Sequence, residues 1–219
     1  MTTLRIPGAV DPHVHLRDMD WAHKAPVERE TAAALAGGYW AVLDMPNTPP
    51  NTTTADRQRA KYDFVAARAR CDFALYMGAD QSADGSENAT GSPQAEGQNM
   101  NCDHTTGSLL LEGDEARRRH LQQWGAVTDK PVALHAEGET LAALLRLVRE
   151  AGVRAHFCHV SLASELAALR AAKADGLPIS VGVTPHHLYL EAADRERLGG
   201  FAMVKPPLKT TADREALWA

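Results

Sequence analysis

The sequence is poor in cysteine, and its cysteines show no spacing that would tie them together. Only Cys71, Cys102 and Cys158 occur among 219 residues, an odd number that matches neither a disulfide framework nor a zinc finger. We therefore expect no disulfide bonds and a reducing compartment, the cytoplasm, as the location of the protein.

Three further absences exclude classes of function. The 28 acidic residues outnumber the 23 basic ones and give a formal net charge of -5, which argues against nucleic-acid binding through overall charge. No apolar run approaches the roughly 20 residues that span a bilayer, and the first residues lack the apolar core of a signal peptide. The usual nucleotide signatures, a G-x-G-x-x-G turn or a P-loop, are also missing. We expect no nucleic-acid partner and no membrane.

The sequence does contain a repeated alternation of strand and helix patterns. Short apolar or β-branched runs alternate with longer alanine-rich amphipathic stretches, which is typical of βα units around a parallel sheet. We count about seven candidate strands, and the clearest are residues 9–16, 39–45, 71–78, 131–135, 155–160 and 179–183. Helices are expected at residues 28–35, 55–69, 114–124, 139–150, 164–174 and 210–218.

Residues 79–107 interrupt this alternation. They are rich in Gly, Ser, Asn, Gln and Asp and hold no apolar run for a buried parallel strand, so we expect an irregular loop. A closed (β/α)8 barrel typically has about 250 residues and eight strands, more than this chain provides. We predict an α/β fold in a single domain over residues 1–219, an incomplete (β/α)8 TIM-like barrel that lacks the C-terminal βα unit. The alternative is a doubly wound open sheet.

A His-x-His pair stands at the end of the first expected strand. Side chains two apart on a strand face the same side, so His13 and His15 point toward one ion or one cavity. Imidazole suits zinc and similar divalent ions, and barrel active sites lie at the C-terminal strand ends. The alternative is two histidines that happen to alternate on a half-buried strand.

Two more histidines, His135 and His159, end later strands. Because parallel strands place their C-terminal ends on one rim, we predict that these two join the first pair around a metal ion or a pair of ions. By strand alternation His156 should face away from His159. His186 and His187 follow another strand and are candidates for outer groups that support the ligands.

Two polar residues near these strand ends are candidates for substrate binding. Arg17 presents a planar fork that matches a carboxylate, and the Asn47 amide both donates and accepts hydrogen bonds. Together they could hold a small acidic substrate beside the metal. A surface salt bridge for Arg17 and an ordinary turn for Asn47 are the alternatives.

These motifs resemble the dihydroorotases of the amidohydrolase superfamily, especially the dihydroorotase domain of multifunctional pyrimidine-pathway enzymes. The resemblance is carried by residues 7–17 (PGAVDPHVHLR), 31–38 (TAAALAGG), 45–48 (MPNT), 133–137 (ALHAE), 158–160 (CHV) and 185–188 (PHHL). It covers most of the chain outside the irregular segment, and it implies a TIM-like barrel of the metal-dependent hydrolase type.

The resemblance also implies a site and a reaction. It implies one or two Zn²⁺ ions with the ligands His13, His15, His135 and His159. Arg17 and Asn47 would bind the substrate carboxylate, and Lys205 would make a further cationic contact. The implied reaction is the reversible ring closure of N-carbamoyl-L-aspartate to L-dihydroorotate in pyrimidine biosynthesis. A hydantoinase or allantoinase is the alternative within the same superfamily.

The sequence departs from the family pattern at two places. Asn99 aligns with the lysine that bridges two metal ions, and Asp103 and His104 are nearby alternatives for that role. The sequence ends before the block that carries the family's catalytic aspartate, so we expect no catalytic residue of that kind. A second hypothesis is therefore an inactive dihydroorotase-like subunit, as a homo-oligomer or beside a partner such as aspartate carbamoyltransferase. A third is a sequence error in residues 79–104 and at the end.

Overall fold

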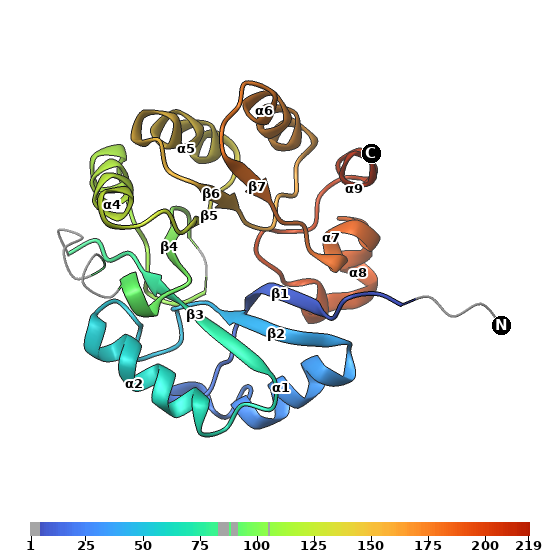
Figure 1. The fold of residues 1–219 in the computed structure, drawn as a ribbon. Helices are drawn as coiled ribbons and strands as arrows, with labels where there is room; N and C mark the ends of the chain where they lie inside the picture. The colour runs from blue at the N-terminus through green and yellow to red at the C-terminus, as the bar shows by residue number, and fades with distance from the viewer. Residues whose placement is uncertain (1–4, 83–87, 89–91, 105) are drawn as a thin grey trace.

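Seven parallel strands form one curved sheet in which neighbours along the chain are also neighbours in space (Figure 1). The computed structural model describes residues 5–82, 88, 92–104 and 106–219. The strands are β1 (Ala9–Val14), β2 (Tyr39–Asp44), β3 (Asp72–Gly78), β4 (Gly97–Asn101), β5 (Val132–His135), β6 (Ala155–Phe157) and β7 (Ile179–Val181). Pairing runs from β1 to β7 in chain order, and among the described residues no pairing joins β7 to β1. The sheet is therefore an incomplete TIM-like barrel, which confirms the predicted fold class.

The main helices lie on the outer side of this sheet, and those that follow β7 lie between β7 and β1 in the view of Figure 1. The α-helices are α1 (Val27–Ala36), α2 (Ala55–Ala66), α4 (Asp114–Val127), α5 (Gly138–Ala151), α6 (Ala163–Ala174), α7 (Pro185–Tyr189), α8 (Asp194–Leu198) and α9 (Thr211–Trp218). The 3-10 helices in the described part of the chain are η1 (Met19–Trp21), η2 (Ser92–Gln94) and η3 (Gly199–Ala202). Of the helices that the structure describes, none combines the length and the apolar character needed to cross a membrane.

The apolar side chains that the structure describes pack in three separate clusters. The largest includes Trp124 of α4 and Phe157 of β6 and fills the space between β4–β7 and the helices outside them. A smaller one joins Val42 of β2 to Val65 of α2. The third cluster belongs to the strands and their ends, and its buried members are Met45, Tyr76, Ala133 and Cys158. The strand ends that carry the candidate site therefore stand on a packed support.

Strand β4 corrects the expectation that residues 79–107 form an irregular loop. Gly97–Asn101 pairs with both β3 and β5, and all five residues are buried. One of its polar side chains is held by an internal contact, since the Gln98 amide nitrogen donates to the Asn88 side-chain oxygen at 2.8 Å. A Cβ atom on Gly97 would lie 2.5 Å from the Pro131 carbonyl oxygen, so glycine permits the close approach of the next strand. Residues 83–87, 89–91 and 105 of the expected loop lie outside the described residues.

Candidate metal centre

The chain just after β1 is held in place by a buried ion pair. Lys61 of α2 and Asp44 of β2 lie 3.2 Å apart, with side chains only 3% and 1% exposed. The Asp44 carboxylate accepts the backbone N–H of Leu16 at 2.6 Å, and the Lys61 ammonium donates to the Leu16 carbonyl at 3.2 Å. The backbone N–H and carbonyl of Leu16, which lies between His15 and Arg17, are therefore both fixed by charged partners. Burial raises the pKa of Asp44, and the neighbouring Lys61 opposes that shift.

The structure brings the four predicted histidines together at the C-terminal ends of β1, β5 and β6. The His13 ring lies 5.3 Å from His15, 4.9 Å from His135 and 5.4 Å from His159 between centroids. The His135 and His159 rings are 4.8 Å apart, with His135 Nδ1 and His159 Nε2 at hydrogen-bonding distance, 2.9 Å. Their role as metal ligands stays a prediction.

Burial keeps these imidazoles neutral. It lowers the pKa of His13 to about 2, helped by the neighbouring His15, and it lowers the pKa values of His15 and His159 to about 4. The pKa of His135 is also lowered, by burial and by the nearby His159. A neutral imidazole keeps one lone pair, which is the form that binds a metal ion.

The free nitrogen atoms fit a cation. Among the described residues, His135 Nε2 and His159 Nδ1 are buried without a hydrogen-bond partner. A buried nitrogen that gains no hydrogen bond is costly, and a bound metal ion would satisfy a lone pair there. The donor set, several imidazoles with a thiol beside them, is one that zinc accepts. The residues present therefore fit a zinc-type ion.

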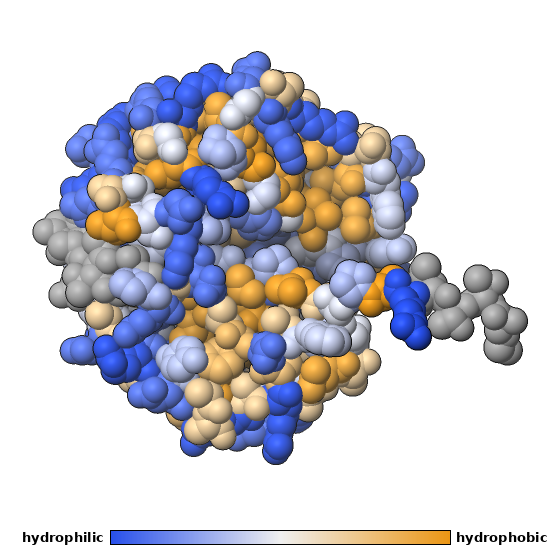
Figure 2. Space-filling model, viewed as in Figure 1, coloured by the Kyte–Doolittle hydropathy of each residue, from blue (hydrophilic) through white to orange (hydrophobic). Residues whose placement is uncertain are grey.

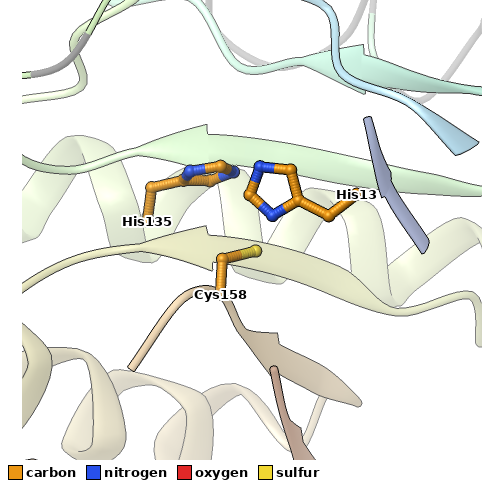
Figure 3. Close-up of side chains that lie close together, drawn as sticks. All are labelled: His13, His135 and Cys158. Atoms are coloured by element: carbon orange, nitrogen blue, oxygen red, sulfur yellow. The ribbon is translucent and has the colours of Figure 1, made fainter. Parts of the chain in front are cut away.

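A cysteine that the sequence analysis did not select also points into this cluster. His13, His135 and Cys158 each offer one ligand atom, and these three atoms all lie within 4.8 Å of one another (Figure 3). The signal in the sequence was the direct neighbour relation of Cys158 to His159 at a strand end. Strict alternation hid it, because it assigns adjacent residues to opposite faces.

The backbone at His159 explains why alternation fails. His159 has a positive φ of 38°, so the chain leaves the extended conformation directly after Cys158. As a result His156 lines the same cavity as His159, and the expectation that it faces away was wrong. His156 Nδ1 lies 2.8 Å from the Ser180 hydroxyl of β7.

The histidines border a cavity of about 420 Å³ that also contains the predicted substrate-binding residues Arg17, Asn47 and Lys205. In the view of Figure 1 the surface is hollowed near its centre, and hydrophilic side chains cover much of its outer part (Figure 2). The Arg17 guanidinium donates to the Asn47 side-chain oxygen at 3.0 Å, which leaves other guanidinium N–H groups for a ligand. The cavity thus combines a cationic wall with a cluster of neutral imidazoles.

Asn47 also sets the tautomer of one imidazole. Its amide nitrogen donates to the Thr106 carbonyl at 2.7 Å, so its oxygen faces Arg17 and His15. His15 Nδ1 lies 2.8 Å from that oxygen and must carry the proton that it donates. The lone pair of His15 is then on Nε2, the arrangement that outer hydrogen bonds impose on metal-binding histidines.

The three candidates for a bridging ligand have different surroundings. Asn99 of β4 lines the cavity and is 2% exposed, with its amide nitrogen 3.4 Å from the Met45 sulfur. Asp103 is engaged elsewhere, because its two oxygens accept the Glu137 backbone N–H and the Thr140 hydroxyl, both at 2.8 Å. These contacts support the start of α5. His104 is exposed and borders a separate, much smaller space with Asp103.

Known proteins resemble this chain in sequence and in fold. No family model matches it. The chain is 38% identical over 220 residues to the multifunctional protein CAD of Squalus acanthias, covering 98% of this chain and 10% of that protein. It is 33% identical over 235 residues to a dihydroorotase of Thermococcus kodakarensis, covering 97% of this chain and 53% of that enzyme. The chain therefore spans about a tenth of the multifunctional relative and about half of the dihydroorotase.

The fold is shared with a solved hydantoinase. The L-hydantoinase (dihydropyrimidinase) from Arthrobacter aurescens superposes with a TM-score of 0.91 at 25% sequence identity, over 97% of this chain and 54% of that one. The similarity to these two proteins is consistent with the motif of residues 7–17 and with the four histidines that lie together at the strand ends. The chain is therefore similar in sequence to about half of a dihydroorotase and shares its fold with about half of a hydantoinase.

Proposed function

We propose that the chain provides the active site of a dihydroorotase-like, metal-dependent cyclic amidohydrolase, which interconverts N-carbamoyl-L-aspartate and L-dihydroorotate in pyrimidine biosynthesis. One observation carries this proposal: neutral imidazoles gather at the strand ends in the same cavity as Arg17 and Asn47. The cavity of about 420 Å³ is of the size that small-molecule sites have. The sequence similarity to a dihydroorotase supports it.

The proposed cofactor is zinc, as one ion or two. The candidate ligands are His13, His15, His135 and His159. A bound zinc ion would polarise the amide carbonyl and lower the pKa of a water molecule from 15.7 toward about 7. The free thiols of all three cysteines are consistent with our proposal of a cytoplasmic location.

The cationic side chains of the cavity would hold the substrate. Arg17 is half-buried and already oriented by Asn47, so its planar fork can meet a carboxylate with little loss of side-chain freedom. Lys205 lines the same cavity and offers a second positive charge. Both N-carbamoyl-L-aspartate and L-dihydroorotate carry a carboxylate that these groups can bind.

The direct test is hydrolysis of L-dihydroorotate by the purified chain with zinc supplied. We expect turnover by the natural sequence and by His23→Ala, which changes an exposed histidine that does not line the cavity. We expect the rate of His13→Ala to fall to background. Equal rates for the natural chain and His13→Ala would contradict the proposal.

A hydantoinase activity is the second candidate, and one feature of the cavity favours it. Val183, Met203 and Val204 line the cavity beside the polar residues, so a cyclic amide with an apolar substituent would find an apolar wall. The solved L-hydantoinase of similar fold supports the same alternative. Comparing the rates on a hydantoin with an apolar side chain and on L-dihydroorotate separates the two candidates.

An inactive, supporting subunit is the third candidate. The observation that favours it is the neutral amide of Asn99, which lines the cavity where an anionic ligand would assist a second ion. Such a subunit would form a homo-oligomer or bind a partner such as aspartate carbamoyltransferase, without turnover. Sedimentation of the chain alone and with that partner measures this, and a monomer in both cases would exclude it.

A further inference from the structure

Two rings of the candidate metal centre, those of His135 and His159, have no outer hydrogen bond that orients them. His15 differs, because its Nδ1 lies 2.8 Å from the Asn47 oxygen. Among the described residues, the ring nitrogens of His135 and His159 contact only each other, at 2.9 Å, and the remaining nitrogen of each ring has no partner. The position of this pair must therefore come from the backbone segments that carry the two residues.

The backbone that carries His159 has a conformation that needs support. Its φ of 38° lies in the left-handed region, which is unfavourable for a residue with a side chain and persists only where the surrounding contacts fix it. The backbone N–H of Cys158, just before it, donates to the Leu134 carbonyl of β5 at 3.0 Å. The N–H of Val160, just after it, donates to the Gly182 carbonyl at 2.9 Å. These bonds fix the inner half of the turn after β6.

The carboxylate of Glu165 fixes the outer half of this turn. Glu165 lies in the first turn of α6, is 3% exposed, and its Oε2 accepts the backbone N–H groups of Ser161 at 3.2 Å and Leu162 at 3.0 Å. An acidic residue in the first turn of a helix commonly makes such contacts. Its Oε1 does more, because it accepts the N–H of Gly138, the first residue of α5, at 2.7 Å. One buried carboxylate therefore joins the segment after β5 to the segment after β6.

Both ends of this link lie close in the chain to the histidine pair. Gly138 follows His135 by three residues, and Ser161 follows His159 by two. Helices α5 and α6 lie side by side (Figure 1). Their first N–H groups carry partial positive charge, so a carboxylate that accepts hydrogen bonds from both helix starts is stabilised there. The link is therefore favoured by charge as well as by geometry.

Other carboxylates near these segments hold only one of them. On the α5 side, Asp103 accepts the Glu137 N–H and the Thr140 hydroxyl, both at 2.8 Å. On the α6 side, Asp213 of α9 accepts the Ala163 N–H at 3.0 Å. Within the described part of the chain, neither carboxylate accepts a hydrogen bond from the other segment. Thr140 and Asp213 thus offer matched controls, one on each side of the link.

We propose that Glu165 is a positioning residue of the candidate metal centre: its carboxylate joins the two segments and so holds the rings of His135 and His159 against each other. Glu165 does not line the cavity, so it acts only through the two histidines. The inference rests on the proposed function for the purpose of the pair. The link itself exists without a metal ion.

Nuclear magnetic resonance of the metal-free chain tests the link without measuring activity. A proton held between the His135 and His159 nitrogens gives a separate downfield imidazole N–H signal, which His159→Ala should abolish. We expect this signal in the natural chain, in Thr140→Val and in Asp213→Asn. We expect its loss in Glu165→Gln, because the new NH2 group cannot accept an N–H. Zinc affinity, measured by titration, should fall by about 10-fold to 100-fold in Glu165→Gln and stay unchanged in both controls.

A second variant, Glu165→Asp, separates positioning from folding. Its carboxylate can still accept the N–H groups at the start of α6, but it is one methylene too short to reach Gly138 as well. We expect a thermal unfolding midpoint close to that of the natural chain, together with the loss of the imidazole signal and of zinc affinity. In the natural chain the Gly138 amide should exchange its hydrogen slowly, and exchange as fast as that of an exposed amide would overturn the link.

The outcomes separate this inference from the proposed function. An imidazole signal and a zinc affinity that survive both Glu165 variants would overturn the positioning role and leave the metal site intact. Equal losses in Asp213→Asn or Thr140→Val would also overturn it, because Glu165 would then act like any residue that supports a helix start. If only the Glu165 variants lose the signal but the natural chain binds no zinc, the link stands and the proposed metal-dependent function fails.

Discussion

Alternate side chains at the ends of β1 and β4 line the same cavity, but those at β1 are imidazoles and those of β4 are amides. His13 and His15 come from β1 and the residue that follows it, and Asn99 and Asn101 come from β4. The backbone geometry is comparable, since both are parallel strands that end at the same rim. Imidazoles offer lone pairs to a cation, whereas amides are neutral and bind metal ions weakly. Of these two strands, β1 therefore provides the candidate metal ligands of our proposal, and β4 contributes neutral polar groups to the cavity.

The chain just after β1 is held by the buried pair of Lys61 and Asp44, and Lys61→Met tests this anchor. The substitution leaves the Asp44 carboxylate buried without its ion-pair partner and removes the donor to the Leu16 carbonyl. We expect a loss of about 3–5 kcal/mol in the free energy of unfolding. Urea unfolding measures it, with Lys173→Met on the exposed face of α6 as the matched control. A loss no greater than that of the control would show that the pair does not anchor β1.

Replacing His13 with asparagine makes β1 resemble β4. We expect His13→Asn to weaken zinc binding by about 100-fold or more, because the lone pair nearest to both His135 and Cys158 is removed. Isothermal titration with zinc measures the affinity, and chelation of zinc from the natural chain should reproduce the state of the variant. His23→Asn, on the surface, is the control. Unchanged affinity in His13→Asn would place the ion elsewhere.

A substitution in β4 complements this experiment by adding an anionic side chain to the cavity. Asn99→Asp puts a carboxylate into the cavity at a position that is 2% exposed. Near a bound cation this charge is favourable, so we expect zinc affinity to rise about 10-fold or a second ion to bind. Metal content per chain and titration distinguish these results. Asn51→Asp, between β2 and α2 and outside the lining of the cavity, is the control. An equal response of both variants would mean that position 99 has no special relation to the ion.

The smallest effect is expected directly after β4, at Asp103. Asp103→Asn keeps the size of the side chain but removes the charge that accepts the Glu137 N–H and the Thr140 hydroxyl. We expect a loss of about 1 kcal/mol in stability, as for a helix-capping residue, and unchanged zinc affinity. A variant that folds normally but loses zinc would instead identify Asp103 as a ligand.

The sequence predicted the strands with apolar patterns and the histidines at their ends, because periodicity and strand direction determine both. It did not predict β4, since the residues around Gln98 and Asn99 look like a loop until their hydrogen-bond partners from distant segments are known. It also missed Cys158 and misplaced His156. Both errors arise at His159, whose positive φ ends the alternation that the prediction assumed.

The oxygen of Asn47 is shared by Arg17 and His15, and this sharing couples two kinds of ligand. When an anion engages the guanidinium, less of its hydrogen-bonding capacity remains directed at the amide, and the imidazole N–H becomes the main donor to that oxygen. A stronger hydrogen bond from Nδ1 makes Nε2 a better electron donor to a cation. Acidic substrate and metal ion should therefore enhance the binding of each other by the same factor, as linkage requires.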